Sequence, residues 1–245
     1  MATYKALAGR LFASSWWKGI DADLERRGFR PATPAQVRQT ESIHVQVLSP
    51  NLVRMDRGGC VDHVMIGTIH GYQARTFLVR LRGGYHWIDA PAAAVKLPAA
   101  FAPTTIRRAR RGVRPVGLKR ALFELGSFNR AVDVRSEDTY FASALVDARM
   151  IAWLSDNLDR CVIEVADGWA VAWSNSLLGA MRSPTELLDV LQRFAERIPN
   201  SVRSLFPRGD RPEMGWVHSR PRKGVSALID RISEEPSGSP TTPGD

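Results

Sequence analysis

The expected fold of this 245-residue chain is decided by Leu125–Leu178, which reads LGSFNRAVDVRSEDTYFASALVDARMIAWLSDNLDRCVIEVADGWAVAWSNSLL. Within this block, Phe128–Val134 is rich in apolar residues and predicts a strand. Ser136 then precedes two acidic residues, as an N-cap precedes the first turn of a helix. An apolar stripe at helical spacing continues to about Asn157. The block therefore predicts a strand followed by a helix that faces a core.

A hairpin and a last helix are predicted after that helix. Asp167-Gly168 separates two apolar runs, and an Asp-Gly pair in that position is a strong signal for a two-residue turn between strands. Further along, Ser183 and Glu186 have the spacing of a capping box, with a proline at the first helical position. Apolar residues at helical spacing follow as far as Pro199, which is expected to end or kink the helix.

The first half of the chain predicts one helix and several strands. Tyr4–Arg27 has an apolar face and ends before Gly28, a natural C-terminal cap; a helix lying on a membrane surface is the alternative. Val61–His70 and Gln73–Arg82 flank a Gly-Tyr pair and predict a hairpin. Tyr85–Lys96 predicts a third strand, interrupted by its proline.

The segment between the first helix and these strands is expected to be irregular. Phe29–Arg57 is polar and contains three prolines, which favour loops. Within it, Pro34–Arg38 is expected to form a short helix and His44–Leu48 a short strand.

Together these elements predict an α+β fold, in which antiparallel strands carry amphipathic helices packed on one face. Changes of composition divide the chain into four expected parts. They are an N-terminal helix with a hairpin-rich half (1–106), a basic linker (107–120), a strand–helix–hairpin–helix half (121–207) and a flexible tail (208–245).

Composition and cysteine usage are those of an ordinary globular protein, with 44% hydrophobic and 24% charged residues. No apolar run approaches the ~18–20 residues that cross a bilayer. Charges at Lys5, Arg10 and Lys18 interrupt any signal-peptide core, so a cytoplasmic location is expected. Cys60 and Cys161 stand alone, which favours two buried thiols over a disulfide between them.

The sequence contains no recognisable catalytic or metal-binding pattern. GxSxG, P-loop and GxGxxG signatures are missing. The histidines are His44, His63, His70, His86 and His218. No two of them have the spacing that brings two metal-binding imidazoles to one face of a helix or strand. No catalytic residue, metal or cofactor is therefore assigned.

One basic segment carries most of the net charge of +9, because residues 107–120 contain seven cations and no acid. Such a segment can contact phosphates or anionic lipid. The alternative is a solvated linker, because no aromatic residues are interleaved to stack bases, and arginine outnumbers lysine 29 to 5, as a GC-rich genome produces. The candidate anion- or nucleic-acid-binding residues are Arg107, Arg108, Arg110, Arg111, Arg114, Lys119 and Arg120.

Several stretches together resemble a family of uncharacterised bacterial proteins, a domain of unknown function found in Arg/Ala-rich proteomes. They are HGYQARTF, FNRAVDV, SEDTYFASALVDARMIAWL and the hairpin that ends in an apolar–Trp pair. The resemblance extends from about Leu24 to Phe206. It implies the fold described above and no activity. Members of that family often carry membrane segments, a feature that the N-terminus of this chain does not share.

Well-formed core patterns without a catalytic grouping lead to one main hypothesis, a non-enzymatic interaction or accessory protein with an unknown protein partner. The alternative is binding of nucleic acid or an anionic surface through residues 107–120, with a peripheral membrane contact as one form of it. An enzyme of unrecognised type would need polar side chains that converge in one pocket.

Overall fold

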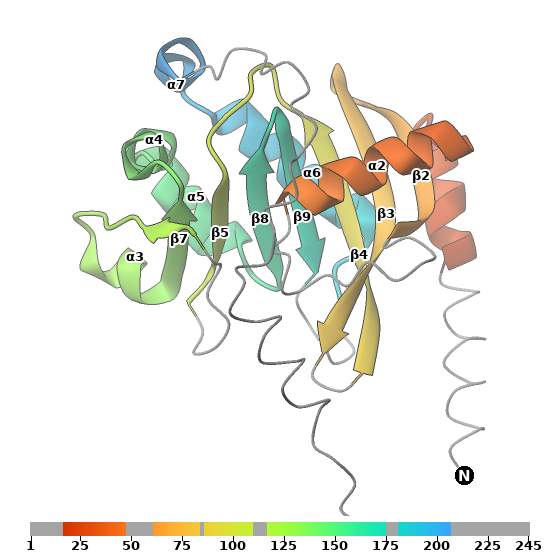
Figure 1. The fold of residues 1–245 in the computed structure, drawn as a ribbon, viewed down its shortest axis with the longest axis horizontal. Helices are drawn as coiled ribbons and strands as arrows, with labels where there is room; N and C mark the ends of the chain where they lie inside the picture. Colours follow the sequence, from red (N-terminus) through yellow and green to blue (C-terminus); the bar gives the residue numbers. More distant parts are fainter. Residues whose placement is uncertain (1–16, 48–60, 84–85, 110–116, 175–180, 207–245) are drawn as a thin grey trace, which may run out of the picture. The chain divides into compact units, whose positions relative to one another are not determined.

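The computed structural model describes residues 17–47, 61–83, 86–109, 117–174 and 181–206, without the side chains of 44–47, 80–83 and 86–89 (Figure 1). They belong to a unit that spans Met1–Gly209. A second unit, Asp210–Asp245, lies outside the described residues. The predicted flexible tail and the first part of the predicted N-terminal helix therefore lie outside them as well.

Nine strands of the described part form one antiparallel sheet in the order β1-β2-β3-β4-β9-β8-β5-β7-β6. The α+β fold with an antiparallel sheet is thereby confirmed. The strands are β1 (Arg30–Pro31), β2 (Val61–Ile69), β3 (Tyr72–Gly83), β4 (His86–Lys96), β5 (Thr104–Arg108), β6 (Lys119–Arg120), β7 (Val132–Ser136), β8 (Cys161–Ala166) and β9 (Trp169–Ser174).

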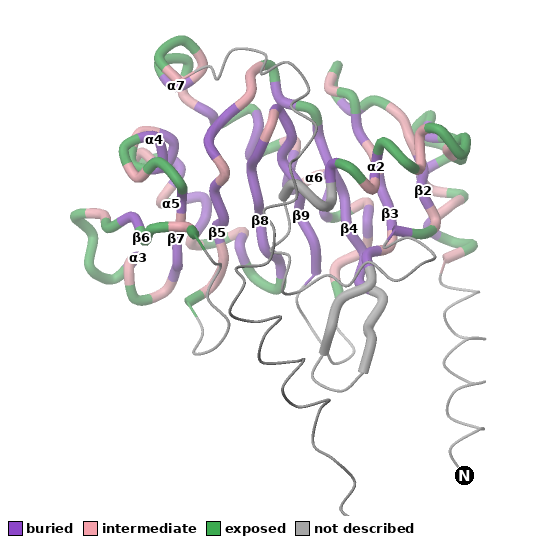
Figure 2. Tube along the Cα trace, viewed as in Figure 1, coloured by how far each residue is buried: buried purple, intermediate pink, exposed green. Residues whose placement is uncertain are grey.

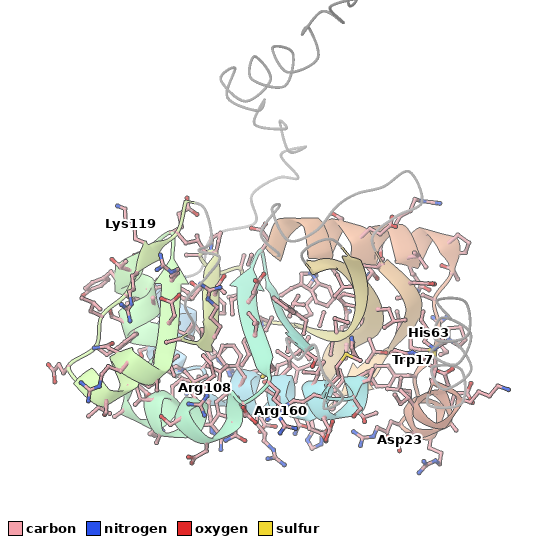
Figure 3. All side chains as sticks on the ribbon, turned by 90° about the horizontal axis from the view of Figure 1, so that it is seen from below. Trp17, Asp23, His63, Arg108, Lys119 and Arg160 are labelled. Atoms are coloured by element: carbon pink, nitrogen blue, oxygen red, sulfur yellow. The ribbon has the colours of Figure 1, made fainter. Side chains whose placement is uncertain are left out.

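Helices pack on both faces of this sheet, whereas the sequence predicts them on one face, because the central strands are apolar on both sides. One face carries α5 and α6, and the opposite face carries α2, as the view along the sheet shows (Figure 3). The helical residues 17–26 pack on the α6 side through Ile20 and Leu24. The other helices are α2 (Pro34–Val47), α3 (Gly126–Ala131), α4 (Thr139–Leu145), α5 (Ala148–Asn157), α6 (Pro184–Arg197) and α7 (Asn200–Leu205).

The central strands are buried (Figure 2), and the alternation of their side chains supplies the two apolar layers of the core. In β4, Ala93 and Val95 face α6, whereas Ala92 and Ala94 belong to the layer below α2. All four residues are fully buried. Alanine has almost no side chain to hold helices away, so elements on either face can approach β4 closely.

The two predicted hairpins are confirmed. β8 and β9 are joined by Asp167 and Gly168, whose φ values of 47° and 79° suit a turn of type I′. β2 and β3 are joined at His70 and Gly71, with φ values of 47° and 82°. The capping box of α6 is also present, because Ser183 accepts from the backbone N–H of Glu186 at 3.2 Å and the Glu186 carboxylate accepts in return at 2.6 Å.

The stretch Phe128–Val134 is only partly the strand that the sequence predicts. Its first residues form the short helix α3, and β7 begins at Val132. The Asn129 side chain holds this helix by accepting from the backbone N–H of Phe123 and donating to the Phe123 carbonyl. Such local side-chain bonds compete with strand pairing and are not visible in hydrophobic periodicity.

The helix predicted from Ser136 to Asn157 is two helices. Asp138 caps α4 and Asp147 caps α5, each by accepting backbone N–H groups through its side chain. Ser136 is instead the last residue of β7, where its hydroxyl lies 2.7 Å from that of Thr104. An aspartate inside an apolar stripe was therefore the signal for a second helix start.

The region predicted to be irregular contains a long helix. α2 runs over Pro34–Val47, so the strand predicted around His44–Leu48 is wrong over its described residues. Few apolar residues mark this helix, and they include Val37 and Ile43. Arg75 of β3 adds polar attachments to Gln36, Gln39 and Thr40, and such attachments leave no signal in apolar periodicity.

The two predicted halves share one sheet. β4 from the first half pairs with β9 from the second half over Ala92–Lys96. β5 runs through the predicted boundary at residue 106 and continues to Arg108, and β6 holds Lys119 and Arg120. Both described ends of the predicted linker are thus strand residues, and residues 110–116 lie outside the described part of the chain.

Gly67 offers a test of close packing between β2 and Phe29. A Cβ at position 67 would lie 2.7 Å from Cγ of the buried Phe29 ring. Gly67→Ala is expected to lower the free energy of unfolding by about 1–3 kcal/mol, since the ring must shift within a packed core. Urea unfolding measures this change.

Gly19 provides the matched control, because it is helical and nothing lies within 4 Å of a Cβ built there. Gly19→Ala is expected to raise stability by about 0.5–1 kcal/mol through helix propensity. A Gly67→Ala protein as stable as the wild type would contradict the close approach.

Candidate functional site

Strand register brings polar side chains from four neighbouring strands into one row. Glu164 of β8 lies opposite Thr105 of β5, and Thr105 lies opposite Arg135 of β7. Arg135 in turn lies opposite Arg120 of β6. Directly opposed residues in antiparallel strands project from the same face of the sheet. The row therefore crosses the sheet from its centre toward its β6 edge.

A second row lies beside the first. Arg107 of β5 is opposite Val162 of β8 on one side and Asp133 of β7 on the other. Residues two apart along a strand share a face, so Arg107 and Asp133 join the face of the first row. Val162 belongs to the core layer on the α2 side, which places both rows on that side of the sheet.

Three arginines from three strands surround Asp133. We call Arg107, Arg120, Asp133 and Arg135 the Asp133 cluster. Arg107 Nη2 lies 3.1 Å from Asp133 Oδ2 and Arg135 Nε lies 3.0 Å from the same oxygen, while Arg120 Nε lies 3.5 Å from Oδ1. The Asp133 side chain is 11% exposed, against 43% for Arg120. The cluster is thus buried at Asp133 and open at Arg120.

The arginines keep Asp133 charged. Burial by itself raises the pKa of this carboxyl. The hydrogen bonds and positive charges of Arg135 and Arg107 outweigh burial, so the pKa of Asp133 lies below its ordinary value of 3.8. The cluster consequently holds a carboxylate at neutral pH.

Glu164 is a buried acid beside this cluster. It is 3% exposed, and its Oε2 makes no hydrogen bond to a described residue. Burial raises the pKa of Glu164 well above its ordinary value of 4.5, with smaller opposing effects from Trp173 and Arg107. The indole N–H of Trp173 is close enough to act on this pKa but does not meet Oε2 in ordinary hydrogen-bond geometry.

The Asp133 cluster lies beside the strands that α2 covers on this face. Among the described strands, α2 packs mainly on β2, β8 and β9. Arg108 lies on the side of α5, away from this face (Figure 3). The Asp133 cluster and Glu164 are therefore the polar part of a sheet face whose apolar part lies below α2.

The predicted basic residues are not brought together as one strip. Arg107 and Arg108 project from opposite faces of β5, and Arg108 Nη2 donates to the carbonyl of Ser155 on α5 at 2.7 Å. Arg120 joins the Asp133 cluster and Lys119 is exposed at the sheet edge. The remaining candidates, Arg110, Arg111 and Arg114, lie outside the described residues.

Three residues of the site escaped the sequence reading, namely Asp133, Arg135 and Glu164. Asp133 and Arg135 alternate with valines in β7, which is the pattern of a strand with one charged face. Glu164 is the single charged residue of the strand CVIEVA. A lone carboxyl in a run that is otherwise apolar was a usable signal of a buried acid.

The described histidines do not form a metal site. His63 Nε2 lies 2.7 Å from Asp21 Oδ1, and the His63 ring packs 4.8 Å from that of Trp17 (Figure 3). His63 has a φ of 53° at a bulge of β2. The side chains before and after this bulge therefore do not follow one alternation between the two faces of the sheet. This pair attaches helix 17–26 to the sheet. Among the described residues, no three His, Cys, Asp or Glu side chains are grouped to hold a metal ion.

Cys161 is a buried free thiol in β8. Burial raises the pKa of this thiol to about 11, so it remains protonated and unreactive at neutral pH. Cys60 lies outside the described residues. None of the described helices is long and apolar enough to cross a bilayer.

The raised pKa of Glu164 predicts a pH effect on stability. The folded protein holds this proton more tightly than the unfolded chain does. The contribution of protonated Glu164 to the free energy of unfolding is therefore fully present below its ordinary pKa of 4.5. It is lost as the pH rises through the folded-state pKa. Glu164→Gln is expected to be more stable than the wild type at about pH 8, and the difference to shrink toward acid pH.

Chemical unfolding over this pH range measures the effect. Glu124→Gln is the control, because Glu124 is exposed and its variant should follow the wild-type curve. A gain for Glu164→Gln that does not change with pH would show that Glu164 does not titrate in this way.

A distant structural neighbour of the fold is the crystal structure of the mycobacterial trehalose monomycolate transport factor A, TtfA. The TM-score is 0.50 at 13% identity, and the match covers 77% of this chain and 94% of that chain. At this identity the likeness shows the fold alone. No protein-family model matches the sequence, and no curated protein matches it.

Proposed function

We propose that this chain is a non-enzymatic accessory protein that acts inside the cell by binding a partner through the β5–β7–β6 face. The observation that carries the proposal is the Asp133 cluster, three arginines around one carboxylate on β5, β7 and β6, which lies beside the strands on which α2 mainly packs. Arginines are enriched in binding surfaces because each guanidinium offers several fixed donors. The described residues of this face include no nucleophile bonded to a base.

The structural neighbour is in keeping with this proposal. TtfA is named a transport factor and not an enzyme. One fold hosts many functions, so the likeness supports an accessory role in general and assigns no cargo to this chain. The resemblance to a bacterial family of unknown function remains a prediction.

Binding of nucleic acid or an anionic surface through residues 107–120 is the second proposal. It is supported by the exposure of Lys119 and Arg120 at the β6 edge. Arg107 and Arg108 serve it less well, since they project from opposite faces of β5 and already bind Asp133 and a helix carbonyl.

Affinity purification of the full chain from its native host, with and without nuclease, tests both proposals. The wild type is compared with Arg120→Ala, which opens the cluster at its exposed end, and with Arg149→Ala as control. Arg149 lies on α5, with its side chain 82% exposed. We expect the wild type and Arg149→Ala to recover the same protein and Arg120→Ala to lose it.

Each other outcome is equally informative. Equal recovery by all three proteins would reject this face as the binding surface. Recovery that collapses with nuclease would favour nucleic acid. Reproducible turnover of a defined substrate, lost on changing residues of this face, would overturn the non-enzymatic role.

A further inference from the structure

We propose that Arg107, Arg120 and Arg135 bind an oxyanion, a phosphate or carboxylate group of the bound partner, on the β5–β7–β6 face. This inference deepens the proposed function and rests on it for the identity of the face. It concerns the chemistry of the ligand group, which neither the fold nor its structural neighbour specifies.

The first support is a surplus of hydrogen-bond donors. Each guanidinium has five N–H donors. Arg107 uses Nε and Nη2 on Asp133, and Arg135 uses Nε on the same oxygen. Nη1 of Arg107 and both terminal nitrogens of Arg135 therefore have no hydrogen bond to a described residue. Planar donor pairs of this kind match the oxygens of a carboxylate or phosphate.

The second support is charge. The cluster contains three arginines and one aspartate, so its own residues carry a net charge of +2. The side chains of Arg107 and Arg135 are only 19% and 15% exposed, which weakens the screening of their charges by water. The nearest buried acid on the same face, Glu164, adds no negative charge while it is protonated. An incoming anion would neutralise the surplus.

The third support is independent of the arginines. Oε2 of Glu164 is buried and has no hydrogen-bond partner in the described part of the protein. Buried polar atoms are nearly always satisfied, and Oε2, which the indole of Trp173 approaches without a regular hydrogen bond, has capacity for a further partner. Glu164 stands in the row of Thr105 and Arg135 and is within electrostatic reach of Arg107. A protonated carboxyl there can donate its O–H to an anion or accept a ligand hydroxyl.

The test uses the purified full chain and inorganic phosphate, with acetate as the carboxylate probe and sodium chloride at equal ionic strength as the salt control. Isothermal titration and the thermal unfolding midpoint report binding. We expect phosphate or acetate to bind and raise the midpoint where chloride does not. Arg107→Gln is expected to weaken this binding about tenfold, the loss of one charge-assisted hydrogen-bond pair.

Arg108→Gln is the matched control, because Arg108 is the next residue of β5 and faces α5. Its variant should bind the anion like the wild type. Arg120→Ala keeps the test decisive should Arg107→Gln unfold, since Arg120 is the most exposed arginine of the cluster. This variant should also bind more weakly.

Asp133→Asn tests the same site in the opposite direction. The substitution removes the negative charge that competes with an incoming anion, while the amide oxygen of Asn can still accept from the arginines that bind Asp133. We expect this variant to bind phosphate about tenfold more tightly than the wild type and to gain more thermal stability from it. Unchanged or weaker binding by Asp133→Asn would count against the site.

The inference and the proposed function can fail separately. Equal anion binding by the wild type, Arg107→Gln and Arg120→Ala, or phosphate and acetate acting no better than chloride, would overturn the oxyanion site. Capture of a partner that depends on Arg120 would then still support the proposed function. An anion that binds as expected, with no partner captured through this face, would leave the site standing and reject the accessory role.

Discussion

Asp133→Ala is expected to lower the free energy of unfolding by about 3 kcal/mol at neutral pH, because it leaves three arginines on one sheet face without their shared carboxylate. Asp133 is 11% exposed on its side chain, and Arg107 and Arg135 are nearly as buried. Removing one partner of a buried ion cluster costs more than the pair contributes, since the remaining charges stay desolvated. Urea unfolding monitored by circular dichroism measures the loss.

The pH dependence of this loss follows from the lowered pKa of Asp133. A lowered folded-state pKa stabilises the protein above the ordinary pKa of 3.8, and that contribution is lost as the pH falls through the folded-state value. The wild type and Asp133→Ala should therefore converge in acid. The contribution of Asp133 is lost as the pH falls, whereas that of Glu164 is lost as the pH rises.

Asp159→Ala provides the control for Asp133. Asp159 also pairs with an arginine, Arg160 at 3.3 Å, but the two side chains are 60% and 53% exposed. Exposed ion pairs contribute little, so a change of less than about 0.5 kcal/mol is expected. An equally small effect for Asp133→Ala would show that the Asp133 cluster contributes no stability.

Arg75→Ala is expected to cost about 3 kcal/mol, because Arg75 joins α2 to the sheet. From β3, Nη1 of Arg75 donates to the Gln36 carbonyl at 3.2 Å and to Thr40 Oγ1 at 2.8 Å. Its guanidinium also stacks over the Trp169 ring, 5.1 Å from the centroid. Thr40 is fully buried, so loss of Arg75 removes a donor from a hydroxyl that water does not reach.

Unfolding in urea measures the cost of Arg75→Ala, and the slope of the transition reports whether α2 has left the sheet. Arg38→Ala is the control, since Arg38 is an exposed residue of the same helix. Equal stability of the two variants would show that α2 is held by its few apolar residues alone.

Local chemistry explains which elements the sequence predicts well. The Asp167-Gly168 turn and the capping box of α6 depend on residues adjacent or nearly adjacent in the chain. Turn geometry requires a positive φ that Asp and Gly tolerate, and capping requires an oxygen three residues from a free N–H. Both requirements are visible in the amino-acid letters, and both predictions are confirmed.

Side-chain hydrogen bonds, some local and some between distant residues, decide the elements that the sequence misses. α2 has few apolar positions and depends on Arg75, which is 35 residues from Thr40 in the chain. β7 and α3 divide a stretch that reads as one strand, because Asn129 bonds back to Phe123. Interactions of this kind have no period and leave no trace in local patterning.

Residue types alone predicted an α+β chain with an antiparallel sheet and a surplus of positive charge, since hydrophobic alternation, turn residues and charge are properties of single positions. The site required the folded sheet. Arg107, Arg120, Asp133 and Arg135 meet only because β5, β6 and β7 become neighbours. Strand order is set by burial of whole strands against the helices, and it determines which arginine finds the carboxylate and which, like Arg108, turns away from it.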